Sequence, residues 1–313
     1  MAYFEDSKLW PRVVAIDRAK PKLALKKTKF YKLDFTDTLA DVALAEILKK
    51  EECDLLVHTA FPISPLRDEA LAHEIIAIGS FYVFNACNEA GVKKIVMTST
   101  ADVYGALAEN PGFLTEDMPV NGGRLSRFLA DKIDAERQAL KFQKRHPDAV
   151  VSILRPATIL GPTIESFKTR YLIRPIVMTW FGYDPLLQFV HEDDVHRACV
   201  VLIENDHAGI FNLGGDGVMP LSRVIEMTGN INVTIAQLGF RTLAQLLWYA
   251  DISPAPSSFT DFLRYPCIVD SAKIKKALGF KLTYNTKETL MNFIAAHKVK
   301  QQSIKTEAVY VSR

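Results

Sequence analysis

The sequence predicts an α/β protein built on a doubly wound parallel sheet. Short apolar runs that end in polar or acidic residues alternate with longer amphipathic segments, which is the pattern of parallel strands connected by helices. With 313 residues and 49% hydrophobic composition, the chain can bury a full core and carry a smaller second lobe. Sheets of this kind bind ligands at the carboxyl ends of their strands, so residues at strand ends are the first candidates for a site.

The stretch 95–132 contains most of the polar chemistry that could be catalytic. A short apolar run is followed by three hydroxyl residues that end at Thr100, which predicts a buried strand with hydroxyls at its end. The segment 125–146 has helical spacing, with Lys132 one turn after Phe128. Both side chains can therefore face one cleft.

The start of the chain predicts a strand over 12–17 that ends in Asp17. A carboxylate at this position is typical of the second strand of a dinucleotide-binding fold, where it accepts hydrogen bonds from ribose hydroxyls. No glycine-rich turn precedes Asp17. We expect roughly 15–20 residues of such a fold, the first strand and its turn, to be missing, as an internal start codon or an incomplete gene model would produce. Arg18 leaves NADP possible beside NAD, and the acid favours NAD.

The ordered segments VVAID, LDF, VHTA, TSTADVYG, FLADK, RPATILGP and FVHEDD resemble the extended short-chain dehydrogenase/reductase family, of the NAD-dependent epimerase/dehydratase type. The resemblance covers roughly Arg12 to Phe293 and implies a Rossmann-type fold. By this resemblance Thr100 is the hydroxyl that contacts the substrate oxygen, and Lys132 binds the cofactor ribose. Phe128 stands where the family has its proton-transferring tyrosine.

Further cofactor contacts are implied by the same resemblance. Asp34 and Phe35 end the LDF segment, whose acid contacts adenine in the family, although an aspartate that caps a turn is an alternative. The turn after the strand 54–60 implies contacts from Thr59, Ala60 and Phe61, and the RPATILGP segment places Pro156 on the nicotinamide side.

Two functions remain open at this stage. Phenylalanine has no ionisable group, so Phe128 cannot take a proton from a substrate hydroxyl, and losing such a carrier costs roughly 10²–10⁴ in rate. Ile76 likewise replaces an asparagine of the family's proton relay. The first hypothesis is an NAD(P)-dependent enzyme that acts on a hydroxyl of a nucleotide-sugar or a hydrophobic alcohol. The second is a noncatalytic member that serves as a binding or scaffold protein.

Composition excludes several other classes. A net charge of +2 gives no reason to expect nucleic acid as a partner, and no apolar run reaches the roughly 20 uncharged residues that span a membrane. The four cysteines have no CxxC spacing, so neither a metal site nor a disulfide framework is predicted. We expect a cytoplasmic protein with a small-molecule substrate. A homodimer through the segments 71–90 and 125–146 is implied by the resemblance alone.

The chain divides into a dinucleotide-binding domain over 1–164, a mixed region over 165–296 that completes the sheet and forms the substrate lobe, and a loose tail over 297–313. The GIFNLGG segment is expected to begin the lobe, and Asp193 or Asp194 to cap the helix after FVH. In the helix expected at 39–50, the side chains that face the core should be Leu39, Val42, Ala43 and Ile47. Aromatic residues of the lobe could line an apolar pocket or belong to the core; they are Tyr171, Trp180, Phe181, Trp248 and Tyr249.

Overall fold

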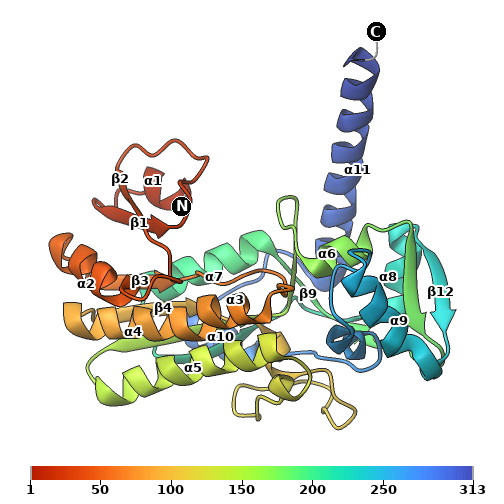
Figure 1. Cartoon of the computed structure of the whole chain (residues 1–313), viewed down its shortest axis with the longest axis horizontal. Coiled ribbons are helices and arrows are strands. Elements are labelled where there is room, and N and C mark those ends of the chain that lie inside the picture. Colours follow the sequence, from red (N-terminus) through yellow and green to blue (C-terminus); the bar gives the residue numbers. More distant parts are fainter. Residues whose placement is uncertain (1, 312–313) are drawn as a thin grey trace.

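The computed structural model describes the backbone of residues 2–311 and the side chains of these residues except 2, 237, 238 and 301–311. Strands and helices alternate through the first two thirds of the chain (Figure 1), which confirms the predicted α/β class. The first elements are α1 (Ala2–Asp6), β1 (Val13–Asp17), β2 (Thr28–Lys32), α2 (Ala40–Lys50), β3 (Leu55–His58), α3 (Glu69–His73), the π-helical turn η1 (Glu74–Ile78), α4 (Gly79–Ala90), β4 (Lys94–Thr98), the 3₁₀ turns η2 (Ala101–Tyr104) and η3 (Gly122–Arg124), α5 (Arg127–Arg145) and β5 (Val150–Pro156).

The second part of the chain has shorter strands. Its elements are β6 (Thr158–Leu160), α6 (Phe167–Leu172), β7 (Ile176–Trp180), β8 (Leu186–Leu187), β9 (Phe189–His191), α7 (Glu192–Glu204), β10 (Gly209–Leu213), β11 (Met219–Pro220), α8 (Leu221–Thr228), β12 (Ile231–Ile235), α9 (Gln237–Tyr249), the 3₁₀ segment η4 (Ser257–Leu263), α10 (Ala272–Leu278) and α11 (Thr286–Val311).

The main sheet is parallel and has the strand order β10-β5-β4-β3. Its central strands are almost continuously apolar because helices cover both of their faces. Ile95 and Met97 of β4 pack into the core under α2, α4 and α5, whereas Val96 faces the core under α7 and α10. This alternation confirms the doubly wound arrangement. It also places the carboxyl ends of β3, β4 and β5 along one edge.

β1 and β2 form a separate parallel pair. Within residues 2–311, neither strand is hydrogen-bonded to β3, and the pair lies beside the main sheet rather than within it (Figure 1). Ile16, Leu33 and Phe35 nevertheless pack against the core cluster that contains Phe128. The pair is therefore anchored by its side chains to the part of the core beneath α5.

The short helix α1 connects this pair to the main body. Glu5 accepts hydrogen bonds from the backbone N–H groups of Lys26, Lys27 and Thr28 at 2.9, 3.1 and 3.0 Å. Tyr3 donates to Glu204 at the end of α7 at 2.8 Å. One helical turn thus links β2 to a helix that covers the main sheet.

The elements α3, η1 and α4 form one continuous helix from Glu69 to Ala90. Its π-helical turn leaves two carbonyl groups that receive side-chain donors: Ser80 donates to Ile76 at 2.5 Å, and Gln138 of α5 donates to Ala77 at 3.0 Å. By length and composition this helix could cross a membrane, but half of its apolar window is buried in the protein. It packs between α2 and α5 as a core helix.

The C-terminal lobe contains a two-stranded parallel sheet of β7 and β12, flanked by α6, α8 and α9 (Figure 1). The expectation that the GIFNLGG segment begins this lobe is wrong, because β10 pairs in parallel with β5 and extends the main sheet. The segment after His297 also differs from expectation. α11 continues as a helix to Val311 rather than becoming irregular.

The inward face predicted for the helix at 39–50 is wrong. Leu39 and Val42 are 66% and 53% exposed, whereas Leu44 and Leu48 are buried against α4. Both apolar stripes of α2 satisfy helical spacing, so periodicity could not choose between them. The stripe of Ala40, Leu44, Ala45 and Leu48 is the one that fills the core.

We expect Leu44→Ala to lower the free energy of unfolding by roughly 2–5 kcal/mol, because it removes a fully buried side chain. Val42→Ala on the same helix should change it by less than about 0.5 kcal/mol, since that position is exposed. Denaturant titration of both variants measures the difference. A larger loss in Val42→Ala than in Leu44→Ala would show that the helix docks through the predicted face instead.

Candidate functional site

β4 ends in the polar turn that carries Thr100. Thr100 is half-buried, and its hydroxyl accepts a hydrogen bond from the backbone N–H of Asp102 at 3.2 Å, so it caps η2. This cap fixes the direction of the chain as it leaves the sheet. It holds Thr100 and Asp102 in one turn at the carboxyl edge of the strands.

α5 brings Phe128 and Lys132 to the same buried face, as the spacing predicts. The ammonium of Lys132 lies 5.2 Å from the centre of the Phe128 ring and 4.6 Å from the centre of the Phe61 ring. No hydrogen-bond acceptor for this ammonium is found in the described part of the chain. The cation is therefore held between two aromatic faces, with Phe61 supplied by the turn after β3.

Burial dominates the electrostatics of this cluster. It lowers the pKa of Lys132 to about 8, and the carboxylates of Asp102 and Glu136 offset part of the effect. Burial, and then the charge of Lys132, lowers the pKa of His58 to about 3. His58 is consequently neutral and hydrogen-bonds Ser80 at 3.1 Å, which makes it a structural residue at neutral pH.

The four residues expected at the β1–β2 pair lie at its carboxyl end. Asp17 is exposed, and one of its oxygens accepts the N–H of Ala19 at 2.9 Å. Asp34 accepts from the backbone and the hydroxyl of Thr36, and these hydrogen bonds, with Arg18 nearby, lower its pKa. Both acids thus shape turns, which was the alternative interpretation of Asp34. Phe35 packs into the core, where its side chain contacts Gly79.

The remaining expected positions lie at other strand ends. Thr59 is exposed and Ala60 half-buried in the turn after β3, where the Thr59 carbonyl accepts the N–H of Phe61 at 2.8 Å. Pro156 is buried as the last residue of β5 and pairs with Leu213 of β10. The structure thus brings Phe61, Phe128 and Lys132 together.

Sequence reasoning missed a buried polar network under the site. Arg155 of β5 donates to both oxygens of Glu136 on α5, with its Nε 3.0 and 3.2 Å from them, and both side chains are 3% exposed. Its Nη1 also donates to the Tyr104 hydroxyl at 2.7 Å, and this hydroxyl donates to Asn212 at 2.9 Å. The network ties α5, η2 and β10 to the central strand. Its members are 19 to 108 residues apart, so no local motif reveals it.

A second missed contact joins two parts of the chain at the same edge. Lys168 of α6 donates to Asp102 at 2.6 Å and to the hydroxyl of Thr158 at 3.0 Å. All three residues line a pocket beside the turn that carries Thr100. Of the aromatic residues expected in a pocket, Tyr171 lines this one, whereas Trp180 is 3% exposed in the core and Phe181 is 70% exposed. Trp248 and Tyr249 line a different, more polar cleft.

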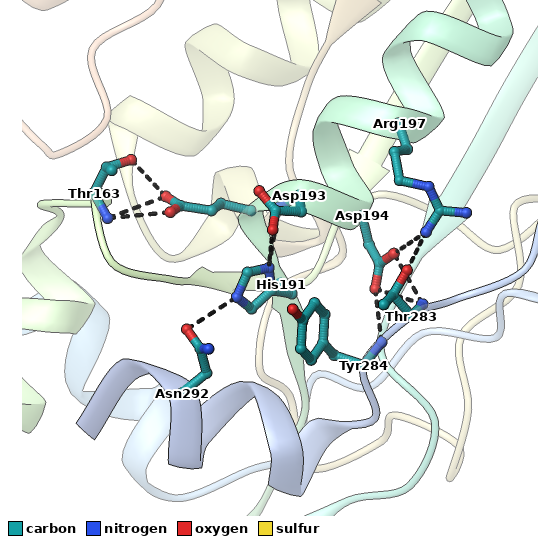
Figure 2. Close-up of polar contacts among 9 residues, drawn as sticks. Thr163, His191, Asp193, Asp194, Arg197, Thr283, Tyr284 and Asn292 are labelled. Atoms are coloured by element: carbon teal, nitrogen blue, oxygen red, sulfur yellow. Dashed lines mark hydrogen bonds and ion pairs between the residues drawn. The ribbon is translucent and has the colours of Figure 1, made fainter. Parts of the chain in front are cut away.

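The FVHEDD segment is structural, as expected, but its helix is capped differently. His191, rather than either aspartate, occupies the N-cap of α7 and accepts the N–H of Asp193 at 3.1 Å (Figure 2). Its other ring nitrogen therefore carries the proton and donates to Asn292 at 3.2 Å. Asp194 is buried and accepts from the backbone of Thr283 and from Arg197. These contacts attach the start of α11 to α7.

Comparison with known proteins tests the family resemblance seen in the sequence. The family model described as "NAD dependent epimerase/dehydratase family" matches residues 2–214, which is more than half of the chain. The chain belongs to this family. The family resemblance seen in the sequence is thereby confirmed.

Individual relatives are more distant. An uncharacterized protein of Mycobacterium tuberculosis is 29% identical over 296 residues, covering 90% of this chain and 76% of that protein. The UDP-glucuronate 4-epimerase of Thermodesulfobacterium geofontis is 27% identical over 250 residues, or 74% of each chain. The structure of DesIV, a dTDP-glucose 4,6-dehydratase from Streptomyces venezuelae with NAD and TYD bound, superposes with a TM-score of 0.71 at 20% identity, over 96% of this chain and 91% of that one. This last likeness supports the Rossmann-type fold.

Lys132 should contribute unfavourably to stability at neutral pH. Because its pKa is lowered to about 8 in the folded protein, the unfolded chain binds an extra proton between about pH 8 and 10.5, and stability rises with pH over that window. We expect Lys132→Met to raise the free energy of unfolding at pH 7, by up to roughly 3 kcal/mol, and to abolish the rise. Lys141→Met, at an exposed position of the same helix, is the control. An unchanged pH dependence in Lys132→Met would contradict the assignment.

The Arg155–Glu136 pair makes a contrasting prediction. Glu136→Ala should destabilise the fold by roughly 3–5 kcal/mol, because it leaves a buried guanidinium without its partner. Replacing both residues by methionine should cost much less, since neither charge then remains buried. Denaturant unfolding of the single and double variants measures the two values. A single variant that is no less stable than the double variant would contradict this account.

Proposed function

We propose that this protein is a nicotinamide-dependent oxidoreductase or epimerase-like enzyme that acts on a hydroxyl group of a small molecule. The observation that carries the proposal is the position of Lys132, whose ammonium faces the Phe128 ring at 5.2 Å on a helix packed against the turn after Thr100. A buried lysine without a carboxylate partner weakens the fold, so its presence supports a role in binding or catalysis.

The chemistry of the expected residues supports contacts to the two ends of a dinucleotide. Asp17 keeps one carboxylate oxygen available for ribose hydroxyls, and Asp34 and Phe35 end the adjacent strand. Lys132 keeps its donors for the nicotinamide ribose, beside Phe61 and the turn at Thr59 and Ala60. A glycine-rich turn for the pyrophosphate has no counterpart in residues 1–78, which contain no glycine.

NAD, when bound, supplies the acceptor for a hydride removed from the substrate carbon. The acid at Asp17 supports NAD over NADP, with Arg18 as the group that would accommodate a 2′-phosphate. Thr100 would hydrogen-bond the substrate oxygen, and Lys132 would hold the ribose with Pro156 bounding the nicotinamide side. Phe128 excludes water next to Lys132 but cannot carry the substrate proton.

A noncatalytic binding protein is the second candidate, and the Phe128 side chain favours it. The phenyl ring packs against Phe259 and occupies the place of a phenol without any ionisable group. Ile76 is fully buried in the π-helical turn and adds no polar group to a proton relay. Such a protein would bind the cofactor and a ligand without turnover.

We also propose a homodimer and a cytoplasmic location. The helices expected to form the dimer expose apolar side chains on their outer faces: Phe81 of α4 is 49% exposed and Leu140 of α5 is 43% exposed. The four cysteines, all free thiols, suit a reducing compartment.

Replacing Phe128 by tyrosine tests whether the site is an enzyme's. The new phenol would lie near the ammonium of Lys132, which favours its ionised form, so we expect NADH formation with a panel of alcohols and nucleotide-sugars to rise roughly 10²–10⁴-fold. Phe128→Leu, which alters the ring but adds no hydroxyl, is the matched control. Undiminished NAD binding with no turnover in either variant would overturn the enzymatic proposal and favour a binding protein.

A further inference from the structure

The pocket beside Thr100 has an apolar interior that limits what it can hold. Its volume is about 160 Å³, and apolar cavities of about 150 Å³ admit a benzene-sized ring. Ala101 and Asp102, which follow Thr100, form part of its wall, so a molecule inside lies next to the proposed site. The apolar side chains of the C-terminal lobe that surround it include Phe167, Leu172, Val177, Phe240, Phe259 and Phe262.

Most polar side chains in the wall are already engaged within the protein. Gln188 donates to Gly215 and Val269 and accepts from the N–H of Val269. The hydroxyl of Tyr171 donates to the carbonyl of Met178 at 2.9 Å. Such groups offer a ligand little hydrogen bonding, so they do not favour a highly polar molecule.

Lys168 is different because it retains a donor. Its ammonium has three N–H groups. One donates to the Asp102 carboxylate and one to the Thr158 hydroxyl, which leaves the third for a ligand. Thr158 accepts from Lys168 and can still donate its own proton. The ring faces of Phe167 and Phe262 flank the ammonium at 5.8 and 5.1 Å. Lys168, Asp102 and Thr158 thus form a small polar group in an apolar wall, called the anchor below.

This anchor can bind an oxygen both as a ketone and as an alcohol. Lys168 and Thr158 can donate to a carbonyl oxygen, and the Asp102 carboxylate can accept from an alcohol. Because the reacting oxygen is assigned to Thr100, the anchor would hold a second oxygen of the substrate. The anchor suits a diphosphate poorly, because Asp102 already balances the charge of Lys168 and would repel the phosphates. Arg174 also lines the pocket, where it donates to the carbonyl of Ile252.

We propose that the pocket binds an apolar, ring-sized molecule with an alcohol or ketone oxygen, distinct from the reacting oxygen, that is held by Lys168, Thr158 and Asp102. The inference rests on the proposed function in taking this pocket as the substrate site, and it chooses a hydrophobic alcohol over a nucleotide-sugar as the substrate class.

Binding of simple probes to the whole chain, without cofactor, tests this choice. In ligand-observed NMR titrations, cyclohexanone should bind more tightly than methylcyclohexane, and UDP-glucose should not displace it. Lys168→Met should weaken cyclohexanone roughly 10-fold, as the loss of one charged hydrogen bond does, and leave methylcyclohexane unchanged. Arg170→Met removes an exposed cation from the same helix outside the pocket wall and should change neither.

The single variant leaves Asp102 without its cation and could misfold, so Lys168→Met combined with Asp102→Asn provides a neutral second test. The same selective loss of ketone binding in this folded double variant supports the anchor. Displacement of cyclohexanone by UDP-glucose, or equal binding of ketone and hydrocarbon before and after substitution, overturns it. Because no turnover is measured, lysine-dependent ketone binding would stand even if Phe128→Tyr failed to gain activity.

Discussion

The buried ion pair between Arg155 and Glu136 is the contact on which the geometry of this edge depends. It connects the central strand to α5, and through the hydroxyl of Tyr104 it also fixes the turn η2. The charges are mutually compensated, and each side-chain nitrogen and carboxylate oxygen of the pair has a hydrogen-bond partner, which a buried pair needs to limit its penalty. Thr100 and Lys132 are attached to two of the elements that this network joins. Their relative position is therefore set by side chains that no ligand would touch.

Lys132 and Lys168 illustrate two ways of placing a cation in this protein. Lys168 has a carboxylate, a hydroxyl and two ring faces around it, so its charge is compensated. Lys132 has ring faces and only more distant acids, and burial lowers its pKa to about 8. The first arrangement keeps a donor ready at fixed charge. The second keeps a cation whose charge is sensitive to whatever binds beside it.

Local patterns predicted β1, β3, β4 and β5, several helices and the facing of Phe128 and Lys132, because each depends on residues within one element. The inward face of α2 could not be predicted, since both of its apolar stripes have helical spacing and the choice is made by α4. The cap of α7 was assigned to Asp193 or Asp194, whereas Asp194 is drawn to the backbone at Thr283, far along the chain. The Asp102–Lys168 pair is likewise 66 residues apart and has no local signal. Polar pairs between residues far apart in the chain could not be predicted from the sequence.

The π-helical turn in the helix from Glu69 to Ala90 changes the phase of that helix. An extra residue in one turn rotates everything after it by roughly 100° relative to what precedes it. His73 before the turn can thus meet Asp131 of α5, while Val83 and Phe84 after it face the core near α2. The turn thus sets which residues of this helix face α5 and which face the core near α2. Deleting one residue there would rotate the two halves relative to each other, and the side chains on one side of the deletion would no longer face their present partners.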